Sequence, residues 1–424
     1  MKLKIPSIKE LKGHLRDPLY RNSIFLMMSS LTNAGSGFFF WIIAARFYST
    51  EDVGLASAII SAMGLISIFS VLGFDIALVR FLPEREDKSE LINTCLTISF
   101  IISLILTLIF VAGINIWSPS LSVIRENKFF LFFFVFFSAT TSLPGLLSQG
   151  VFAGFRRTEY SLFQTLVTLA RLGIIPFLVT FGELGIYAPY GLTPILAFGF
   201  GIFLASRIFP YKPIPTVNIE IIKDIFHFSF GNYFAKIFEY LPVFVLPIMV
   251  INVLGAEMNA YFFMSWQISM LLLTIPRWTT ISLLAEGSHN EETLSANTKR
   301  ALKFIFLLLG PAIIGIFLFG RNILGFFGEE YATNSYELLL VLALGSIPFA
   351  INVIYVTTKR VQKEVMPVIY VYGGVAIITL VASYLLMQSM GIIGVGYSWI
   401  IGNVAIASGV GMGWVMSNMD NGQG

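Results

Sequence analysis

Twelve long apolar segments recur along this chain of 424 residues, and they constrain its fold more than any other feature. Each has about 20 residues or more, the length that an α-helix needs to cross the hydrocarbon core of a bilayer. Hydrophobic residues make up 56% of the sequence and charged residues 12%, and the mean hydropathy is +0.81. The two-residue alternation of membrane barrels is absent. The sequence therefore predicts an all-α integral membrane protein with about 12 transmembrane helices.

Short polar connections separate the apolar segments. The segments are Ser23–Tyr48, Leu55–Val79, Leu91–Trp117, Phe129–Phe155, Ser161–Phe181, Gly185–Phe209, Phe226–Leu254, Met258–Ala285, Ala301–Phe327, Leu338–Thr358, Pro367–Met390 and Gly391–Met416. We predict a cytoplasmic basic lead with an interfacial helix over residues 1–22. An N-terminal half of six helices over 23–209 follows, and then a cytoplasmic linker over 210–222. A C-terminal half of six helices over 223–416 and a cytoplasmic tail over 417–424 complete the chain.

Lys and Arg are distributed unevenly among the connections. Of 27 such residues, 20 fall in the lead and the loops of one side, four fall on the other side, and three lie inside apolar segments. Cytoplasmic loops carry an excess of Lys and Arg. The bias predicts a multi-pass protein of the cell (cytoplasmic or inner) membrane, with both termini in the cytoplasm.

The two halves of the sequence resemble each other weakly. The run Ser142–Pro144 recurs as Ser346–Pro348 after 204 residues, and Glu51 recurs as Glu257 after 206. Because each half has an even number of spans, both halves start on the same side. We therefore expect a parallel repeat related by a pseudo-twofold axis along the membrane normal, with a central cavity between the halves.

Three cationic side chains, Arg171, Lys236 and Arg277, lie inside apolar segments. Each is roughly 12 to 15 Å from the predicted cytoplasmic edge, at about 1.5 Å per residue. A charge at the bilayer centre costs at least about 3 kcal/mol on insertion scales, so such residues usually face a cavity. The alternative is a structural ion pair together with an arginine whose head group reaches the interface.

Two carboxylates, Asp75 and Glu239, lie in the same half of the membrane. Glu239 is three residues from Lys236, so the two share a helix face and can pair. Two roles remain open for these acids. Either one exchanges a proton or a sodium ion during a transport cycle, or both only pair locally.

A polar and glycine-rich cluster, Asn33, Gly35 and Gly37, interrupts the first apolar segment. Such a cluster allows either a hinge or a close helix contact. Elsewhere the sequence offers little to hold a metal or a cofactor, because Cys95 is its one cysteine and its three histidines are scattered. It has no phosphate-binding P-loop either, so this chain alone is not an ATP-driven pump.

Four runs of residues resemble a known transporter family. Gly73–Glu84 resembles the end of the second helix in polysaccharide-exporting flippases, and Ser229–Tyr233 resembles the opening of their seventh. Glu286–Glu291 is similar to the loop after their eighth helix, and Phe327–Tyr331 to the turn before their tenth. Over about Arg21 to Met416 the chain resembles the O-antigen (Wzx-type) flippase branch of the multidrug/oligosaccharidyl-lipid/polysaccharide exporter superfamily.

The resemblance implies a flippase without catalytic activity or cofactor. It would move a polyprenyl-pyrophosphate-linked oligosaccharide from the inner to the outer leaflet by alternating access. Arg171, Lys236 and Arg277 would then bind the pyrophosphate, since arginine forks onto phosphate oxygens and lysine acts as a point charge. The implied partners are the lipid-linked oligosaccharide, membrane lipid, polysaccharide assembly proteins and a coupling proton or sodium ion, but no nucleic acid.

Four further polar side chains are candidate sugar contacts, although each can equally serve as a hydrogen bond between packed helices. They are Asn232, Tyr233, Asn252 and Gln267. Two other functions remain open: a multidrug or organic-cation antiporter of the same superfamily, and a membrane-embedded glycan enzyme. The intramembrane charges favour an anionic substrate, because three cations outnumber two carboxylates.

Overall fold

The computed structural model describes residues 18–289 and 294–420, and within these ranges the chain forms helices and no strand. The first part holds α2 (Pro18–Phe47), α3 (Thr50–Ser70), α4 (Phe74–Phe81), α5 (Lys88–Ala112), α6 (Ile114–Trp117), η1 (Pro119–Leu121), α7 (Val123–Glu126), α8 (Lys128–Thr140), α9 (Leu143–Gly145), η2 (Leu146–Phe152), α10 (Glu159–Val167), α11 (Ala170–Ile174), η3 (Ile175–Phe181) and α12 (Gly182–Ile208). The second part holds α13 (Ile219–Leu254), α14 (Ala256–His289), α15 (Leu294–Gly325), α16 (Glu329–Asn334), α17 (Tyr336–Val361), α18 (Val365–Met390) and α19 (Ile392–Asp420). The interfacial helix predicted in the lead falls largely outside the described residues.

Eleven helical stretches of the described chain are long and apolar enough to cross a membrane. One of them, Glu159–Ile208, has 50 residues and contains the fifth and sixth predicted segments. Gly182 has a φ of 54° at the junction of η3 and α12, and both α10 and η3 pack against α12. This stretch is therefore a hairpin that supplies two of the twelve expected spans. The all-α, multi-span fold class is confirmed.

The second predicted segment, Leu55–Val79, is not one continuous helix. α3 ends at Ser70, and Leu72 and Gly73 then have φ angles of 51° and 74°. Two consecutive residues in the left-handed region cannot continue a right-handed helix. Asp75 therefore lies in the first turn of the short helix α4 rather than near the end of a long span.

The chain separates into two compact units that are each discontinuous in sequence. Unit 1 comprises the described part of residues 1–43 with residues 66–113 and 123–230, and unit 2 comprises residues 44–65, 114–122 and the described part of 231–424. The sequence halves over 23–209 and 223–416 remain a prediction about the repeat.

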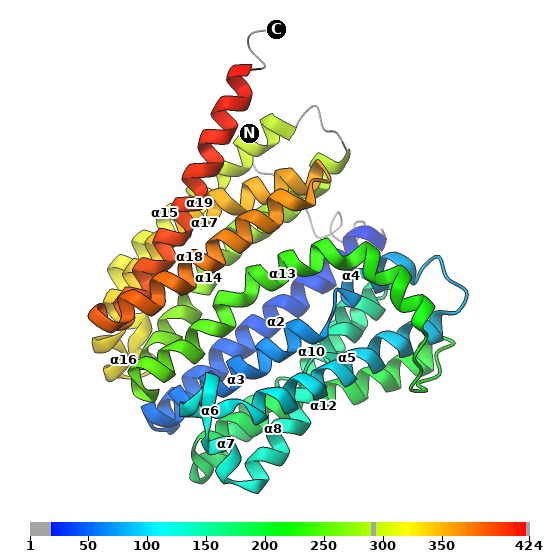
Figure 1. Ribbon diagram of the computed structural model, residues 1–424, viewed down its shortest axis with the longest axis horizontal. Helices are drawn as coiled ribbons and strands as arrows, with labels where there is room; N and C mark the ends of the chain where they lie inside the picture. Colours follow the sequence, from blue (N-terminus) through cyan, green and yellow to red (C-terminus); the bar gives the residue numbers. More distant parts are fainter. Residues whose placement is uncertain (1–17, 290–293, 421–424) are drawn as a thin grey trace, which may run out of the picture. The chain divides into compact units, whose positions relative to one another are not determined.

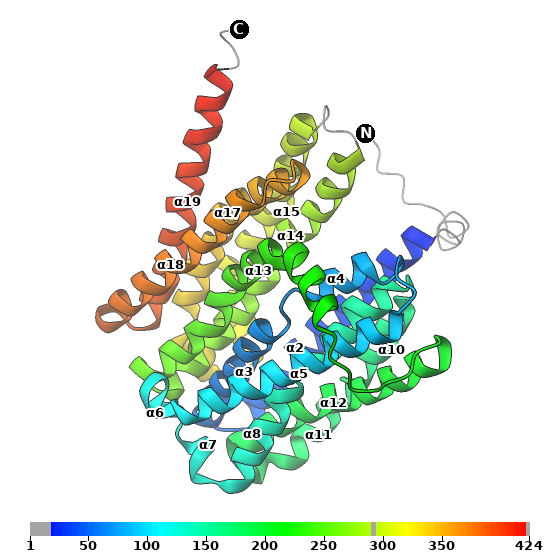
Figure 2. The same ribbon diagram turned by 45° about the vertical axis from the view of Figure 1, so that its right-hand side comes forward.

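Unit 1 has a core built where α4, α5, η2 and α12 meet. Phe74, Cys95, Leu147 and Phe152 are fully buried in it. Figure 2 shows α5, α8 and α12 side by side, in agreement with the contacts of α8 with both other helices. Close packing of long apolar helices leaves few positions where a polar side chain can be accommodated without a partner.

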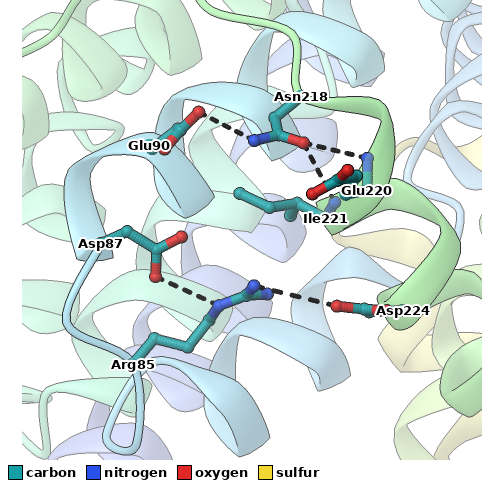
Figure 3. A network of polar contacts seen from close by, with 7 residues as sticks. All are labelled: Arg85, Asp87, Glu90, Asn218, Glu220, Ile221 and Asp224. Atoms are coloured by element: carbon teal, nitrogen blue, oxygen red, sulfur yellow. Dashed lines mark hydrogen bonds and ion pairs between the residues drawn. The ribbon is translucent and has the colours of Figure 1, made fainter.

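The linker predicted over residues 210–222 is fixed to the start of α5. The Asn218 amide donates to Glu90 Oε1 at 2.9 Å, and its carbonyl oxygen accepts from the first backbone N–H groups of α13 (Figure 3). In the same view Arg85 Nη2 lies 3.8 Å from Asp224 Oδ2. The linker is therefore a strap that is hydrogen-bonded to α5, with Asn218 as the N-cap of α13.

A buried tyrosine anchors the other end of this strap. The Tyr211 hydroxyl donates to Asn93 Oδ1 at 2.9 Å, and Asn93 Nδ2 donates to the backbone oxygen of Lys212 at 2.8 Å. Burial raises the pKa of Tyr211 to about 12. The hydroxyl consequently stays protonated, and this hydrogen bond persists across the physiological pH range.

Unit 2 is a bundle of long helices. α17, α18 and α19 pack against one another, and they are the orange-to-red helices of Figure 1. α14 packs against α15 and α17. α3 joins this unit through a very close crossing with α14. A Cβ atom on Gly54 would overlap the Ala256 carbonyl oxygen, and the buried Asn259 side chain donates to the Gly54 carbonyl oxygen at 2.7 Å. Only glycine allows backbones to approach so closely.

The fourth predicted span of each half ends in the same backbone motif. Arg156 and Lys363 have φ angles of 54° and 59° and are 207 residues apart. In both cases the residue that follows donates its N–H to the carbonyl five residues earlier, from Arg157 to Phe152 at 2.8 Å and from Glu364 to Lys359 at 2.9 Å. These are Schellman motifs with a basic residue at the left-handed position. They support an internal repeat.

The predicted topology can be tested by cysteine labelling. In a Cys95→Ser background, single cysteines at the exposed positions Glu126 and Glu330 should react with an impermeant thiol reagent from outside intact cells. Cysteines at the exposed positions Glu86 and Gln362 should react only after the cells are opened. The opposite pattern would reverse the orientation that the positive charges predict.

Candidate functional site

Arg171 in α11 is the most deeply buried of the predicted anion-binding residues, with 6% of its surface exposed. Its Nη2 donates to Ser36 Oγ of α2. The guanidinium carbon lies 5.5 Å from the ring centre of Phe40 and 5.1 Å from that of Tyr190. Three elements of unit 1, α2, α11 and α12, therefore enclose this cation with the Ser36 hydroxyl and the aromatic side chains of Phe40 and Tyr190.

No carboxylate compensates this charge in the part of the chain that the structure describes. The ion pairs found there do not include Arg171, and its Nε is buried without a hydrogen-bond partner. A buried charge without a counter-charge is strongly unfavourable. Aromatic rings and hydroxyl groups offset part of that cost. Anion binding by Arg171 remains a prediction.

The cluster Asn33, Gly35 and Gly37 lies beside this arginine. α2 continues through it without a break, and Ser36 Oγ donates to the Asn33 carbonyl oxygen at 3.2 Å. A Cβ atom on Gly37 would lie 3.9 Å from Arg171 Nη2, whereas one on Gly35 would meet nothing within 4 Å. Gly37 thus lies beside Arg171 at a spacing that would also accommodate a Cβ atom. A hinge at these residues remains a prediction.

Arg277 in α14 is also placed against aromatic rings, but it has a counter-charge. Its Nη2 lies 3.2 Å from Glu239 Oε1 of α13. The guanidinium carbon is 5.7 Å from the ring centre of Tyr240 and 5.5 Å from that of Phe349. The structure therefore shows Glu239 paired with Arg277 across two helices of unit 2. The same-helix pair of Glu239 with Lys236 remains a prediction.

A small cavity borders this ion pair. Its volume is about 20 Å³, which is room for a water molecule rather than for a sugar ring. Asn352, Tyr372 and Asn403 line it together with the two charged residues, and Asn352 Nδ2 donates to the Asn403 carbonyl oxygen at 3.0 Å. These three residues were not among the candidates predicted from the sequence. The sequence feature that could have identified them is an amide or phenol side chain inside an apolar segment.

The other predicted site residues are distributed over both units. Asp75 is buried at the start of α4 in unit 1, and Lys236 is half-buried in α13 in unit 2. The structure brings Glu239 and Arg277 together. The convergence of Arg171, Lys236 and Arg277 on one ligand remains a prediction.

Of the candidate sugar contacts, Asn252 has the clearest packing role. Its side chain accepts from the Ser120 N–H at 3.2 Å and donates to Ser118 Oγ at 3.1 Å, which fixes the segment before α7 to α13. Tyr233 is buried, while Asn232 and Gln267 are half-buried. Sugar binding by these four side chains remains a prediction.

A double-mutant cycle should detect the ion pair in unit 2. Arg277→Gln or Glu239→Gln alone leaves one half-buried charge without this partner and should lower the free energy of unfolding by on the order of 2 kcal/mol. The double variant should lose less than the sum of the two. Thermal unfolding of the purified protein provides the measurement, and strictly additive losses would contradict the pairing.

Comparisons with known proteins agree with the fold. A lipid II flippase MurJ structure, in an inward closed conformation, has a TM-score of 0.77 at 16% identity, covering 91% of this chain and 86% of that chain. An inward-facing multidrug resistance MATE family transporter of the MOP superfamily has a TM-score of 0.69 at 17% identity, covering 94% and 98%. At such identities the likeness concerns the fold alone.

Two curated proteins and one family profile match the sequence. An uncharacterized membrane protein of Methanocaldococcus jannaschii is 23% identical over 233 residues, 53% of this chain and 54% of that protein. A protein of Shigella flexneri, named as a candidate O-antigen transporter, is 23% identical over 185 residues, 43% and 44%. The chain thus spans about half the length of these relatives. The profile described as polysaccharide biosynthesis protein matches residues 19–281, well over half of the chain. The chain belongs to the polysaccharide biosynthesis protein family.

Proposed function

We propose that this protein is a flippase for an anionic, lipid-linked glycan, which it moves from the inner to the outer leaflet of the cell membrane by alternating access. The observation that carries the proposal is the buried Arg171, which has no carboxylate within ion-pair distance among the described residues. A cation retained at such a cost inside an apolar helix is best explained by an anion that visits it.

The chemistry of the site matches a pyrophosphate. The Arg171 guanidinium presents several N–H donors, and its Nε is buried without a partner, so it can bind two phosphate oxygens at once. The prenyl chain of such a substrate would remain in lipid, while the polar part crosses. Family membership supports this substrate class, because lipid-linked glycans are intermediates of polysaccharide biosynthesis.

A drug or organic-cation antiporter needs an available carboxylate. Glu239 lines a cavity that is also bordered by aromatic residues, but it is held by Arg277 at 3.2 Å. An organic cation would have to replace this guanidinium. A coupling role for Glu239, with a proton or a sodium ion, would likewise require release from Arg277, and for Asp75 as for Glu239 it remains a prediction.

Reconstituted transport separates these functions. The purified protein in liposomes should move a fluorescent polyprenyl-pyrophosphate-linked N-acetylglucosamine between leaflets, detected as a change in the fraction of fluorophore that a membrane-impermeant reductant quenches. Ethidium uptake in the same liposomes is the comparison. Ethidium transport without glycan translocation would replace the flippase proposal by the antiporter.

A further inference from the structure

A second cavity lies in unit 1, and Arg171 is not among the residues that line it. Its volume is about 560 Å³, and it is bordered by α4, η2 and the residues that follow each of them. Asp75, Arg80, Glu84, Gln149 and Arg156 line it. Ligand pockets of small molecules typically have about 300 to 1,000 Å³. The cavity is on the side of the membrane that the charge bias predicts to be cytoplasmic.

Close backbone packing builds this cavity. A Cβ atom on Gly150 would come within 2.7 Å of the Leu78 side chain, and one on Gly154 within 2.9 Å of the Leu78 carbonyl oxygen. α4 and η2 are therefore held in direct contact, with their polar side chains on the rim. η2 is a π-helical turn, and such turns are frequent at functional sites.

Charged residues of both signs line the cavity. Arg80 Nη1 and Glu84 Oε1 are 3.0 Å apart and neutralise each other. Asp75, 8% exposed, lies on the buried side. Arg156 is exposed, and none of the ion pairs between described residues includes it. A carboxylate and a guanidinium therefore border the same cavity.

The neighbouring arginine does not contribute to the cavity. Arg157 Nε donates to Glu159 and its Nη2 to the Tyr160 hydroxyl. The hydrogen bond with Glu159 raises the pKa of Arg157. Arg157 therefore serves the turn that leads into α10, and Arg156 alone of the two cations borders the cavity.

Arg156 occupies a backbone position that favours glycine. Its φ of 54° places it at the left-handed residue of the Schellman motif that ends the helix. Any residue with a Cβ atom is strained there. A guanidinium at this position is accordingly not explained by the backbone, which glycine would satisfy better.

We propose that this cavity is a binding site for a phosphosugar, with Arg156 contacting the phosphate, Asp75 accepting hydrogen bonds from the sugar hydroxyls and Gln149 exchanging hydrogen bonds with them. The inference rests on the proposed function, since a lipid-linked glycan presents a sugar directly attached to phosphate. A phospholipid head group offers the same phosphate to Arg156, and an ammonium or glycerol hydroxyl on it can also donate to Asp75, so phospholipid binding is the competing outcome of the test.

The test uses the full chain in nanodiscs and two probes, farnesyl-pyrophosphoryl-N-acetylglucosamine and farnesyl pyrophosphate. Arg156→Gly should weaken binding of both probes about tenfold, the factor for one charge-assisted hydrogen bond of about 1.4 kcal/mol. Asp75→Asn should weaken only the sugar-bearing probe. Lys363→Gly is the matched control, because it changes the same left-handed position of the other half and does not line the cavity.

The two glycine variants also control for folding. Both relieve backbone strain, so neither should lower the unfolding temperature. Unchanged probe binding by Arg156→Gly would overturn the inference. Displacement of the sugar-bearing probe by phosphatidylglycerol at an equal concentration would overturn it as well. If the wild-type protein translocates glycan and the cavity variants bind both probes as the wild type does, only this site is refuted. If the wild-type protein translocates no glycan, the proposed function is refuted instead.

Discussion

Replacing Arg171 by glutamine is expected to slow glycan translocation by about 100-fold while leaving the protein at least as stable as the wild type. A charge-assisted hydrogen bond contributes up to about 3 kcal/mol, which corresponds to that factor. The stability expectation follows from the lack of a carboxylate partner among the described residues. Removing an uncompensated buried charge relieves a desolvation cost and leaves no opposite charge behind. Translocation in liposomes and thermal unfolding of the same preparations are the two measurements.

The opposite signs of these two effects make the experiment decisive. If Arg171 only packed between Phe40 and Tyr190, the substitution would lower stability and would affect translocation no more than that loss explains. Arg171→Lys should retain part of the translocation rate, because the charge remains but the forked geometry is lost. Arg277→Gln is the contrasting variant, since it leaves Glu239 without its partner and should lower stability.

Replacing Gly54 by alanine should lower the free energy of unfolding by about 3 kcal/mol, the upper end for overpacking a close contact. The added methyl group would overlap the Ala256 carbonyl oxygen and lie 3.1 Å from the Ala260 nitrogen. Backbone atoms cannot move away as a flexible side chain can, so α3 and α14 would have to separate. That separation would also break the 2.7 Å hydrogen bond from Asn259 to the Gly54 carbonyl oxygen.

Gly315→Ala is the matched control for this prediction. Gly315 lies inside α15 of the same unit, and a Cβ atom there would meet nothing within 4 Å. Alanine is the better helix former by about 1 kcal/mol, so this variant should be as stable as the wild type or more so. Equal unfolding temperatures for the Gly54 and Gly315 variants would mean that the crossing of α3 and α14 is looser than described.

The sequence was sufficient to predict the helical membrane fold, whereas the depth of the unusual charges in the membrane remains a prediction. Both follow from hydropathy, which is a property of single residues and of their neighbours along the chain. It could not predict that Leu72 and Gly73 interrupt the second segment. These residues lie in an apolar run, and hydropathy carries no information about backbone dihedral angles.

The partners of the charges were harder to predict than their positions. Helical periodicity relates residues three or four apart, so it suggested Lys236 for Glu239. The described partner of Glu239 is Arg277, 38 residues away on another helix. Ser36 illustrates the same limit, because it contacts Arg171 across 135 residues. Such contacts depend on how helices are packed, which one sequence does not reveal.

The strap before α13 has a consequence for how the polypeptide is made. Tyr211, Ile221 and Ile225 belong to the core of unit 1, where they are buried with residues of α4 and α5. A nascent chain that has inserted its first six spans therefore still lacks part of the core on which they pack. Release of a fragment that stops at residue 209 would leave that apolar surface uncovered, so such a fragment should be recognised by quality-control proteases. The first half matures only after the ribosome has begun the second.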